Sequence, residues 1–380
     1  MNNINIALFA ALSVVACTPK ATQEIGTIVF DYSGTAPVYQ YDRVESISII
    51  PLQTDKNCLI GEMPELRVAG DNLFILHGRF SDLEQIDRFN TQGEHLNQIG
   101  RRGRGPGEIS SAASDWFLYG DKMIGLRGFF SKNILLYDFA GNFVREIQLN
   151  TPMSQGRAPT FIMHLQGSDF LALMPAQTDS SRIVRLPETG AAPISMHKSE
   201  KTYSVEVEFL PPFFQTNGKL YYSTIHENAI YKAGQDSLTL TFLTNPGKYA
   251  IPQDFYNKAN WRAFESLIRD NGVVVIYNFD ESKNYYIMQL LVMKEEFEGL
   301  IWGIKHKQEK EWFWSKMDTW PIGTREYSAA EITEDNRLLM LLTPYSLKKQ
   351  LPIMKNLLNP HVADSLKDDD NPVLVEIKLR

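Results

Sequence analysis

The sequence predicts an all-β fold, a six-bladed β-propeller closed by an N-terminal strand that completes the last blade. Apolar runs of strand length recur with a period of about fifty residues, at the kelch-like end of the range for propeller blades. The runs are rich in β-branched and aromatic residues, and Gly, Asn or Asp residues bound nearly all of them. The chain has 380 residues, 43% of them hydrophobic, so it can bury the core of one large all-β domain.

One unit recurs along the chain. It consists of a turn, an apolar strand, a polar turn, a second apolar strand, a glycine turn and a third strand. The clearest copy reads AGDNLFILHGRFSDLEQIDRFNTQGEHLNQIG. The copies span 69–100, 119–149, 166–196, 216–243 and 270–293, with a sixth split between 334–344 and 371–380.

Two segments interrupt the strand pattern and predict helical insertions, PQDFYNKAN at 252–260 and a longer one at 345–368. The chain stops before the sixth copy has an outer strand. A strand without a blade of its own, VESISIIPLQT at Val44–Thr54, precedes the first copy. Because ring closure removes two exposed sheet edges, we expect this strand to complete the last blade.

Four stretches carry a resemblance to a known family: IPLQTDKNCLIGEM, GRGPGE, ILLYDFAGNFVREI and DDDNPVLVEIKL. Together they resemble a family of bacterial six-bladed β-propeller lipoproteins, themselves similar to NHL-repeat propellers. The resemblance runs from about Ile25 to Arg380. It implies the fold, but the family has no assigned activity, so it implies no catalytic or ligand residues. The third copy departs from the pattern because no Tyr-Asp pair precedes its glycine turn.

The N-terminus resembles a bacterial lipoprotein signal over residues 1–17. A short apolar run ends at VVAC, in which Cys17 is the predicted lipidation site. Acylation would tether residues 18–380, the single propeller domain, to a membrane of the bacterial cell envelope, on the periplasmic face or at the cell surface. No Lys or Arg stands near the start, so an ordinary secretory signal or a buried first strand stays open. The other cysteine, Cys58, is expected to be a small buried hydrophobe.

Charge and motifs exclude several functions. A net charge of −7 disfavours a nucleic-acid partner. No nucleophile elbow or phosphate loop is present, and the histidines, at 77, 164, 226 and 306 among others, lack zinc-site spacing. The run at 368–370 lacks the Gly and Glu of an EF-hand calcium loop. We therefore predict no catalytic residues, no metal site and no cofactor from the sequence.

The stretch IGRRGRGPGEIS, at Ile99–Ser110, is predicted to be the crossover between the first two blades. Its glycines let the backbone turn where side chains would clash. Arg101, Arg102 and Arg104 offer forked donors to a carboxylate or sulfate ligand. The alternative is that they form ion pairs with Glu108 or neighbouring blades.

The stretch KEWFWSKMDTW, at Lys310–Trp320, brings together Trp312, Trp314 and Trp320 between the fifth and sixth blades. Exposed tryptophans stack on sugar rings, which would make a ligand platform. The alternative is that Trp312 and Trp314, two residues apart on one strand face, cover the core.

The sequence thus predicts a lipid-anchored binding or interaction module that holds a glycan, a peptide or a partner protein on one ring face or in the channel. One alternative is an enzyme, a metal-dependent hydrolase or a lyase, with acidic residues converging on the channel, and another is a purely structural partner of another envelope protein.

Overall fold

The computed structural model describes residues 26–31, 37–61, 64–78, 84–111, 113–128, 131–151, 159–174, 181–198, 211–223, 228–252, 255, 261–294, 297–316 and 330–380. Cys17 and His226 lie outside the described residues, and so does Trp320. Within the described chain, no helix is long and apolar enough to cross a membrane.

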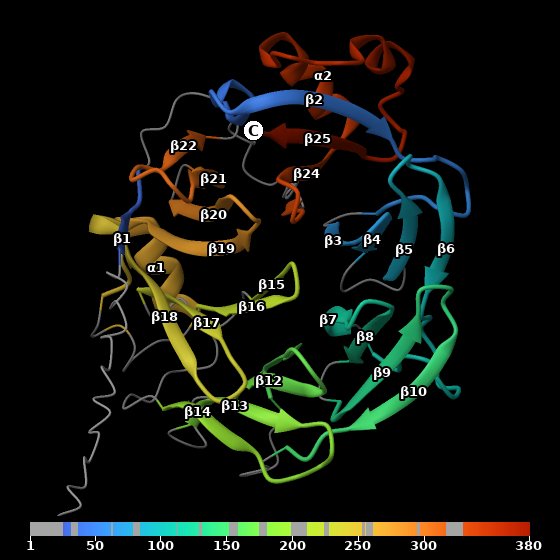
Figure 1. Cartoon of the computed structure of the whole chain (residues 1–380), viewed down its shortest axis with the longest axis vertical. Coiled ribbons are helices and arrows are strands. Elements are labelled where there is room, and N and C mark those ends of the chain that lie inside the picture. The colour runs from blue at the N-terminus through green and yellow to red at the C-terminus, as the bar shows by residue number, and fades with distance from the viewer. Residues whose placement is uncertain are drawn as a thin grey trace, which may run out of the picture.

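Six small sheets stand in a ring, which confirms the predicted all-β six-bladed propeller (Figure 1). Each blade has four consecutively paired antiparallel strands, and the first strand of each lies nearest the ring centre. The strands of blades 1 to 3 are β3 (Glu65–Ala69), β4 (Asn72–His77), β5 (Gln85–Asn90), β6 (His95–Ile99); β7 (Ala113–Tyr119), β8 (Met123–Gly128), β9 (Asn133–Asp138), β10 (Phe143–Gln148); β11 (Phe161–His164), β12 (Asp169–Leu173), β13 (Ser181–Pro187), β14 (Ile194–Lys198). Those of blades 4 to 6 are β15 (Phe213–Thr216), β16 (Lys219–Tyr222), β17 (Ala229–Ala233), β18 (Leu238–Asn245); β19 (Val273–Glu281), β20 (Tyr285–Lys294), β21 (Phe297–His306), β22 (Phe313–Lys316); β23 (Ala330–Ile332), β24 (Arg337–Leu342), β25 (Val373–Leu379), and β2 (Val44–Pro51).

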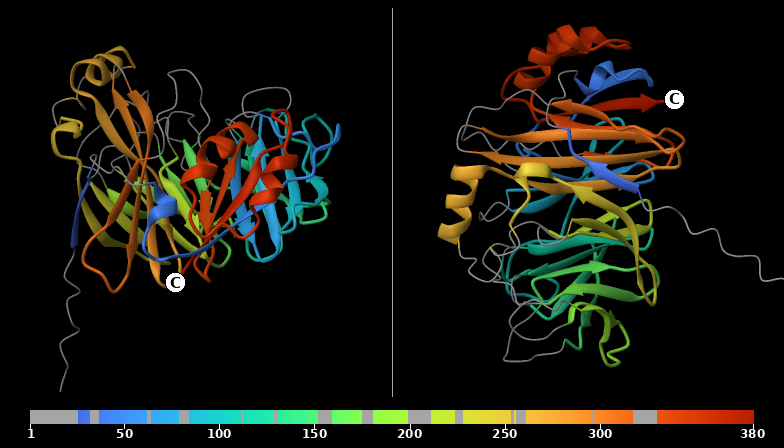
Figure 2. Two further views of the ribbon diagram at one scale, coloured as in Figure 1. Left: turned by 90° about the horizontal axis from the view of Figure 1, so that it is seen from above. Right: turned by 90° about the vertical axis from the view of Figure 1, so that its left-hand side faces the viewer.

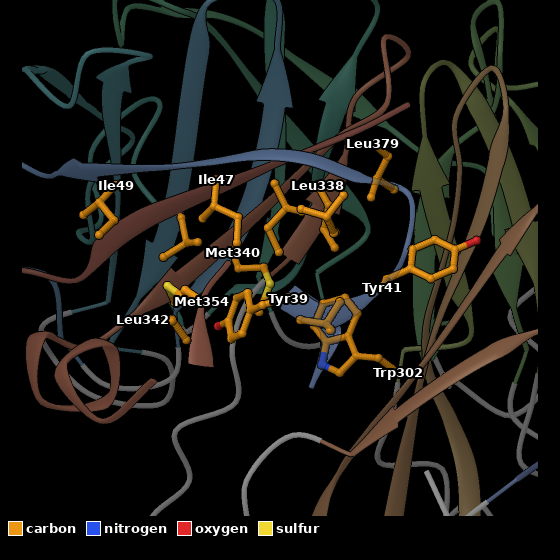
Figure 3. Packing of buried hydrophobic residues seen from close by; sticks show 14 of the residues in the cluster. Tyr39, Tyr41, Ile47, Ile49, Trp302, Leu338, Met340, Leu342, Met354 and Leu379 are labelled. Carbon is orange, nitrogen blue, oxygen red and sulfur yellow. The ribbon is translucent and has the colours of Figure 1, made fainter. Parts of the chain in front are cut away.

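The last blade confirms the predicted closure. Strand β2, from the N-terminal part of the chain, pairs antiparallel with β25 as the outermost strand of blade 6. Its inward side chains, Ile47 and Ile49, join a core cluster with Leu338 and Met340 of β24 and with Trp302 of blade 5 (Figure 3). Burial of this apolar surface joins the two ends of the chain and locks the ring.

The insertion between β24 and β25 covers the outer edge of β2 (Figure 2). It holds α2 (Pro344–Gln350) and short 3-10 helices at Leu351–Ile353 and Pro360–Ser365, as predicted for 345–368. The side-chain amide of Asn359 accepts from the Ile49 N–H at 2.9 Å and donates to the Ile49 carbonyl at 2.7 Å. An edge that would otherwise pair with another chain is therefore satisfied internally.

We expect Ile47→Ala to lower the free energy of unfolding by about 2–5 kcal/mol, because it opens a cavity in the closure core. Ile47 is 0% exposed. Leu358→Ala, at a side chain 66% exposed beside the same strand, is the control and should change stability by less than about 0.5 kcal/mol. Urea unfolding of both variants measures the difference, and equal effects would contradict a buried closure strand.

Two parts of the prediction need correction. The first helix is α1 (Trp261–Asn271), beyond the expected 252–260, of which only Pro252 and Phe255 are described. Phe264 and Leu267 of α1 pack against blade 5. The fifth repeat copy was matched one strand out of step, because its first apolar run is the innermost strand β19 and not the second strand of a blade.

A strand that the sequence did not predict extends blade 4. Strand β1 (Gly26–Val29) pairs in parallel with β18, so that this sheet has five strands. It lies at the rim of the ring (Figures 1 and 2). The first described residues are therefore held at the outer edge of blade 4, away from the ring centre.

Candidate functional site

The predicted crossover is confirmed, since Ile99–Ser110 leads from β6 of blade 1 towards β7 of blade 2. Arg101 is exposed and its Nε donates to Glu108 at 2.7 Å. The other Glu108 carboxylate oxygen accepts the Gly105 N–H at 2.7 Å. These contacts hold the pKa of Glu108 below its ordinary value, the Gly105 N–H first among them.

Glycine is required where this loop folds back on itself. A Cβ at Gly103 would lie 2.0 Å from the Glu108 carboxylate, and one at Gly107, where φ is +70°, would lie 2.5 Å from the Phe143 ring. A recess beside the crossover, lined in part by Arg101 and Arg102, has a volume of about 20 Å³. That volume holds about one water molecule, far less than a sugar ring needs.

Trp312 and Trp314 stack on each other with ring centroids 5.7 Å apart. They are half-buried against the core between blades 4 and 5, where Trp314 meets Phe30 edge-on and Trp312 meets Phe242 edge-on. Gly303 on the neighbouring strand leaves room for both indoles, since its Cβ would lie 2.7 Å from Trp314. Each indole thus packs against apolar neighbours of its own. The role of Trp312 and Trp314 as a platform for a sugar stays a prediction.

The described histidines among those that the sequence singled out lie on three different blades. His77, His164 and His306 lie on blades 1, 3 and 5. In the described part of the chain, no three His, Cys, Asp or Glu side chains are grouped so as to hold a metal ion.

Two histidines meet on one buried carboxylate at the closure. His77 and His95 each place Nε2 2.7 Å from a different oxygen of Asp87. His77 Nδ1 accepts the Gly61 N–H at 2.9 Å, so its ring proton is on Nε2 and points to Asp87. Gly61 belongs to the segment between β2 and β3, so this cluster braces the junction between the last blade and the first.

Arg67 lies near the ring centre, and no described residue accepts a hydrogen bond from its guanidinium. Arg67 comes from β3, the innermost strand of blade 1, and its guanidinium carbon lies 5.5 Å from the centroid of the Trp116 ring. Among the residues that the structure describes, the Arg67 side chain makes no hydrogen bond or ion pair, and its Nε is shielded from solvent. The Trp116 indole N–H donates to Glu65 Oε2 at 2.6 Å, which fixes the ring beneath the guanidinium.

Two buried carboxyl groups face Arg67 from blades 5 and 6. Asp280 on β19 is 3% exposed and Glu331 on β23 is 4% exposed. Burial raises the pKa of Asp280 to about 7, against a smaller opposing effect of Arg67. Burial also raises the pKa of Glu331, and Asp280 adds to the increase. Asp280 accepts hydrogen bonds from Asn278, at 3.0 Å, and from Thr216, and Glu331 accepts the Val68 N–H at 2.9 Å.

The contrast with Asp115 shows that this cluster is unusual within the ring. Asp115, on the innermost strand of blade 2, also accepts an N–H from the next blade, that of Ile162 at 3.1 Å. It has its own counter-ion, the fully buried guanidinium of Arg127. Among the described residues, Arg67 is the cation that acts on both Asp280 and Glu331, and its side chain pairs with neither. We call Arg67, Trp116, Asp280 and Glu331 the axial cluster.

Amide side chains tie the innermost strands together at one end of the ring centre. Gln215 of blade 4 exchanges two hydrogen bonds of 2.9 Å with the backbone of Leu118 in blade 2. Asn217 donates to the carbonyls of Glu281 at 2.8 Å and Ile332 at 3.0 Å, where strands β19 and β23 end. The axial cluster therefore lies beside an end of the ring that these amides bridge.

The sequence analysis did not single out any residue of the axial cluster. Arg67 and Glu331 lie on short innermost strands that precede the repeat unit, and Asp280 lies on the strand that was matched out of step. A polar side chain in a short apolar strand was the available signal.

Comparison with known proteins gives the family. The family model described as "Domain of unknown function (DUF4934)" matches residues 29–378. No curated protein matches the chain. Among solved structures, a "Putative exported protein" from Bacteroides fragilis NCTC 9343 has 19% identity and a TM-score of 0.69, with 93% of this chain and 99% of that chain covered.

A member of the duf4221 family from Bacteroides vulgatus has 9% identity and a TM-score of 0.55, with 89% and 97% of the two chains covered. At these identities both likenesses concern the fold alone. The match of the family model over nearly the whole chain shows that the protein belongs to the DUF4934 family, a propeller family without an assigned function.

Proposed function

We propose that the protein is an exported binding module that holds a polar ligand, such as part of a glycan or peptide, at the centre of its ring. One observation carries the proposal: the Arg67 guanidinium has no acceptor among the described residues and stands where blades 1, 2, 5 and 6 meet. Its Nε–H is shielded from solvent and has no acceptor among those residues, and burying a donor without an acceptor costs free energy. A ligand that supplies oxygen acceptors would recover that cost.

We propose that the ligand approaches from the side where the innermost strands begin. The support is that Asn217 donates to the carbonyls of Glu281 and Ile332, where the innermost strands of blades 5 and 6 end. The blade-to-blade crossovers lead into those beginnings, and the crossover with Arg101, Arg102 and Arg104 is one of them. These arginines stay a prediction as outer ligand contacts on that face.

A thermal-shift screen on residues 18–380 tests the proposal. Its panel holds neutral and acidic sugars, short peptides and divalent metal ions. A ligand that binds only the folded state raises Tm by mass action. We expect a hit whose shift is lost in Arg67→Gln and kept in Arg145→Gln.

Arg145 is a matched control, because its guanidinium also lies 5.9 Å from a ring centroid, that of Tyr119, but on an outer strand and paired with Glu188. A shift that survives Arg67→Gln would contradict a ligand at the ring centre. A metal hit with turnover of a substrate would instead support the hydrolase or lyase alternative.

We propose further that Cys17 is lipidated and tethers the ring to an envelope membrane. Export is consistent with the described character of the Bacteroides fragilis protein. Eight residues separate Cys17 from Gly26, and even fully extended they span at most about 30 Å. The rim at blade 4, where β1 lies, would then be the part of the ring nearest the membrane.

Replacing Cys17 with serine tests the tether. We expect the native chain to fractionate with membranes and the Cys17→Ser chain to lose this association. Equal membrane association of both chains would contradict lipidation at Cys17.

A further inference from the structure

We infer that the axial cluster binds a carboxylate-bearing ligand and takes up a proton when it does so. The inference rests on the proposed function, in that it assigns a ligand class to the same site. It is carried by the placement of an unpartnered guanidinium beside two buried carboxyl groups.

The positive charge of the Arg67 guanidinium favours a negatively charged ligand. The Arg67 guanidinium carbon lies 5.5 Å from the centroid of the Trp116 ring, and the N–H donors of a guanidinium lie in its own plane and point outward from its edge. A carboxylate matches that edge with two parallel N–H···O bonds, which a single hydroxyl or carbonyl oxygen cannot do. A cationic ligand would meet the positive charge of Arg67, whereas a neutral sugar would leave that charge unmatched.

Asp280 and Glu331 are the groups that would take up the proton when the ligand binds. The charged groups that act on Asp280 are Arg67 from β3 and Glu331 from β23, and Glu65, also on β3, accepts the Trp116 indole N–H at 2.6 Å. A ligand carboxylate on Arg67 would be repelled by ionised Asp280 and Glu331. Because both groups are buried and already favour the neutral acid, a proton removes the repulsion, and the protonated carboxyl becomes a donor.

Calorimetric titration with two sugars that differ at one group provides the test. Glucuronate carries a carboxylate where glucose carries a hydroxymethyl group. Acetate and succinate extend the carboxylate series, and sulfate is the anion without a carboxyl group. Titration near pH 7 in two buffers of different ionisation enthalpy counts the protons taken up.

We expect at least one carboxylate to bind at millimolar concentration, and glucose to bind roughly tenfold more weakly than glucuronate or not at all. Up to one proton should enter per ligand near pH 7. Above that pH the affinity should fall by up to about tenfold per pH unit, because Asp280 must then be protonated on binding.

The variants separate the roles of the residues. Arg67→Gln should weaken carboxylate binding roughly 10- to 100-fold, and Arg145→Gln should leave it unchanged. Asp280→Asn should keep binding but lose most of its pH dependence above pH 7. If Arg67→Gln does not fold, two measurements on the native chain still test the inference. These are the comparison of glucuronate with glucose and the number of protons taken up on binding.

The inference would be contradicted if glucose and glucuronate bound with equal affinity, or if sulfate bound as tightly as the carboxylates. It would also be contradicted if protons were released on binding, or if no carboxylate bound at millimolar concentration. Arg67-dependent binding of a neutral ligand would overturn the ligand class and leave the proposed function standing. Binding that is independent of Arg67 would overturn both.

Discussion

Arg127→Met is expected to lower the free energy of unfolding by about 3–5 kcal/mol, among the largest losses for a single substitution in this ring. Arg127 is 1% exposed and pairs with Asp115, which is also buried. It donates as well to the carbonyls of Thr160 at 3.1 Å and Ser131 at 3.3 Å. Removing it leaves a buried carboxylate without a counter-ion and two carbonyls with one donor fewer.

Urea unfolding at pH 7 measures this loss. Arg145→Met is the matched control, because Arg145 pairs with Glu188 at a side chain 44% exposed. Exposed ion pairs contribute about 0–1 kcal/mol, so the control should lose little. A loss at Arg127 no larger than that at Arg145 would contradict the view that the Asp115 pair holds blades 2 and 3 together.

Asp280→Asn is expected to stabilise the protein above neutral pH, by about 4 kcal/mol relative to the native chain at pH 8 and above. Burial raises the pKa of Asp280 from 3.8 to about 7 in the folded state. Between these values the folded chain binds a proton that the unfolded chain has lost, so native stability falls as pH rises through this range. Asparagine carries no such proton and removes the penalty.

The measurement is the free energy of unfolding from pH 4 to pH 8. The two chains should be similar near pH 4 and diverge as pH rises. Asp270→Asn, at a side chain 61% exposed, is the control and should run parallel to the native chain. Parallel curves for Asp280→Asn as well would show that Asp280 ionises freely in the folded protein.

The sequence predicted the architecture because a propeller is specified by short-range signals. Strand-length apolar runs and turn residues recur in every blade, and each can be recognised without knowing its neighbours. The closure by Val44–Pro51 was also predictable, since the chain held one strand without a blade and one blade without a strand. Strand β1 carried no such constraint, because blade 4 was complete without it.

The helix at 261–271 was misplaced for a local reason. Proline at 252 suggested a helix start, whereas the apolar spacing of Phe264, Leu267 and Ile268 fits one helix face that ends at Gly272, where φ is +74°. The signal was in the sequence and was given too little weight.

The chemistry at the ring centre could not be predicted in the same way. The sequence offered two clusters of neighbours along the chain, Arg101–Arg104 and Trp312–Trp320, and it placed the first at the crossover. In the described structure Arg101 pairs with Glu108, and Trp312 and Trp314 stack within the edge of the core.

The number of blades and their turns could be predicted from the sequence because they depend on residues close together along the chain, and the closing strand could be predicted by matching the strand without a blade to the blade without a strand. The polar side chains that meet at the axis could be identified only in the folded ring. Arg67, Asp280 and Glu331 are far apart in sequence and come together because ring closure places the first, fifth and sixth blades side by side. Their lack of individual counter-ions is a property of that meeting, since burial and mutual charge arise only when the ring is complete.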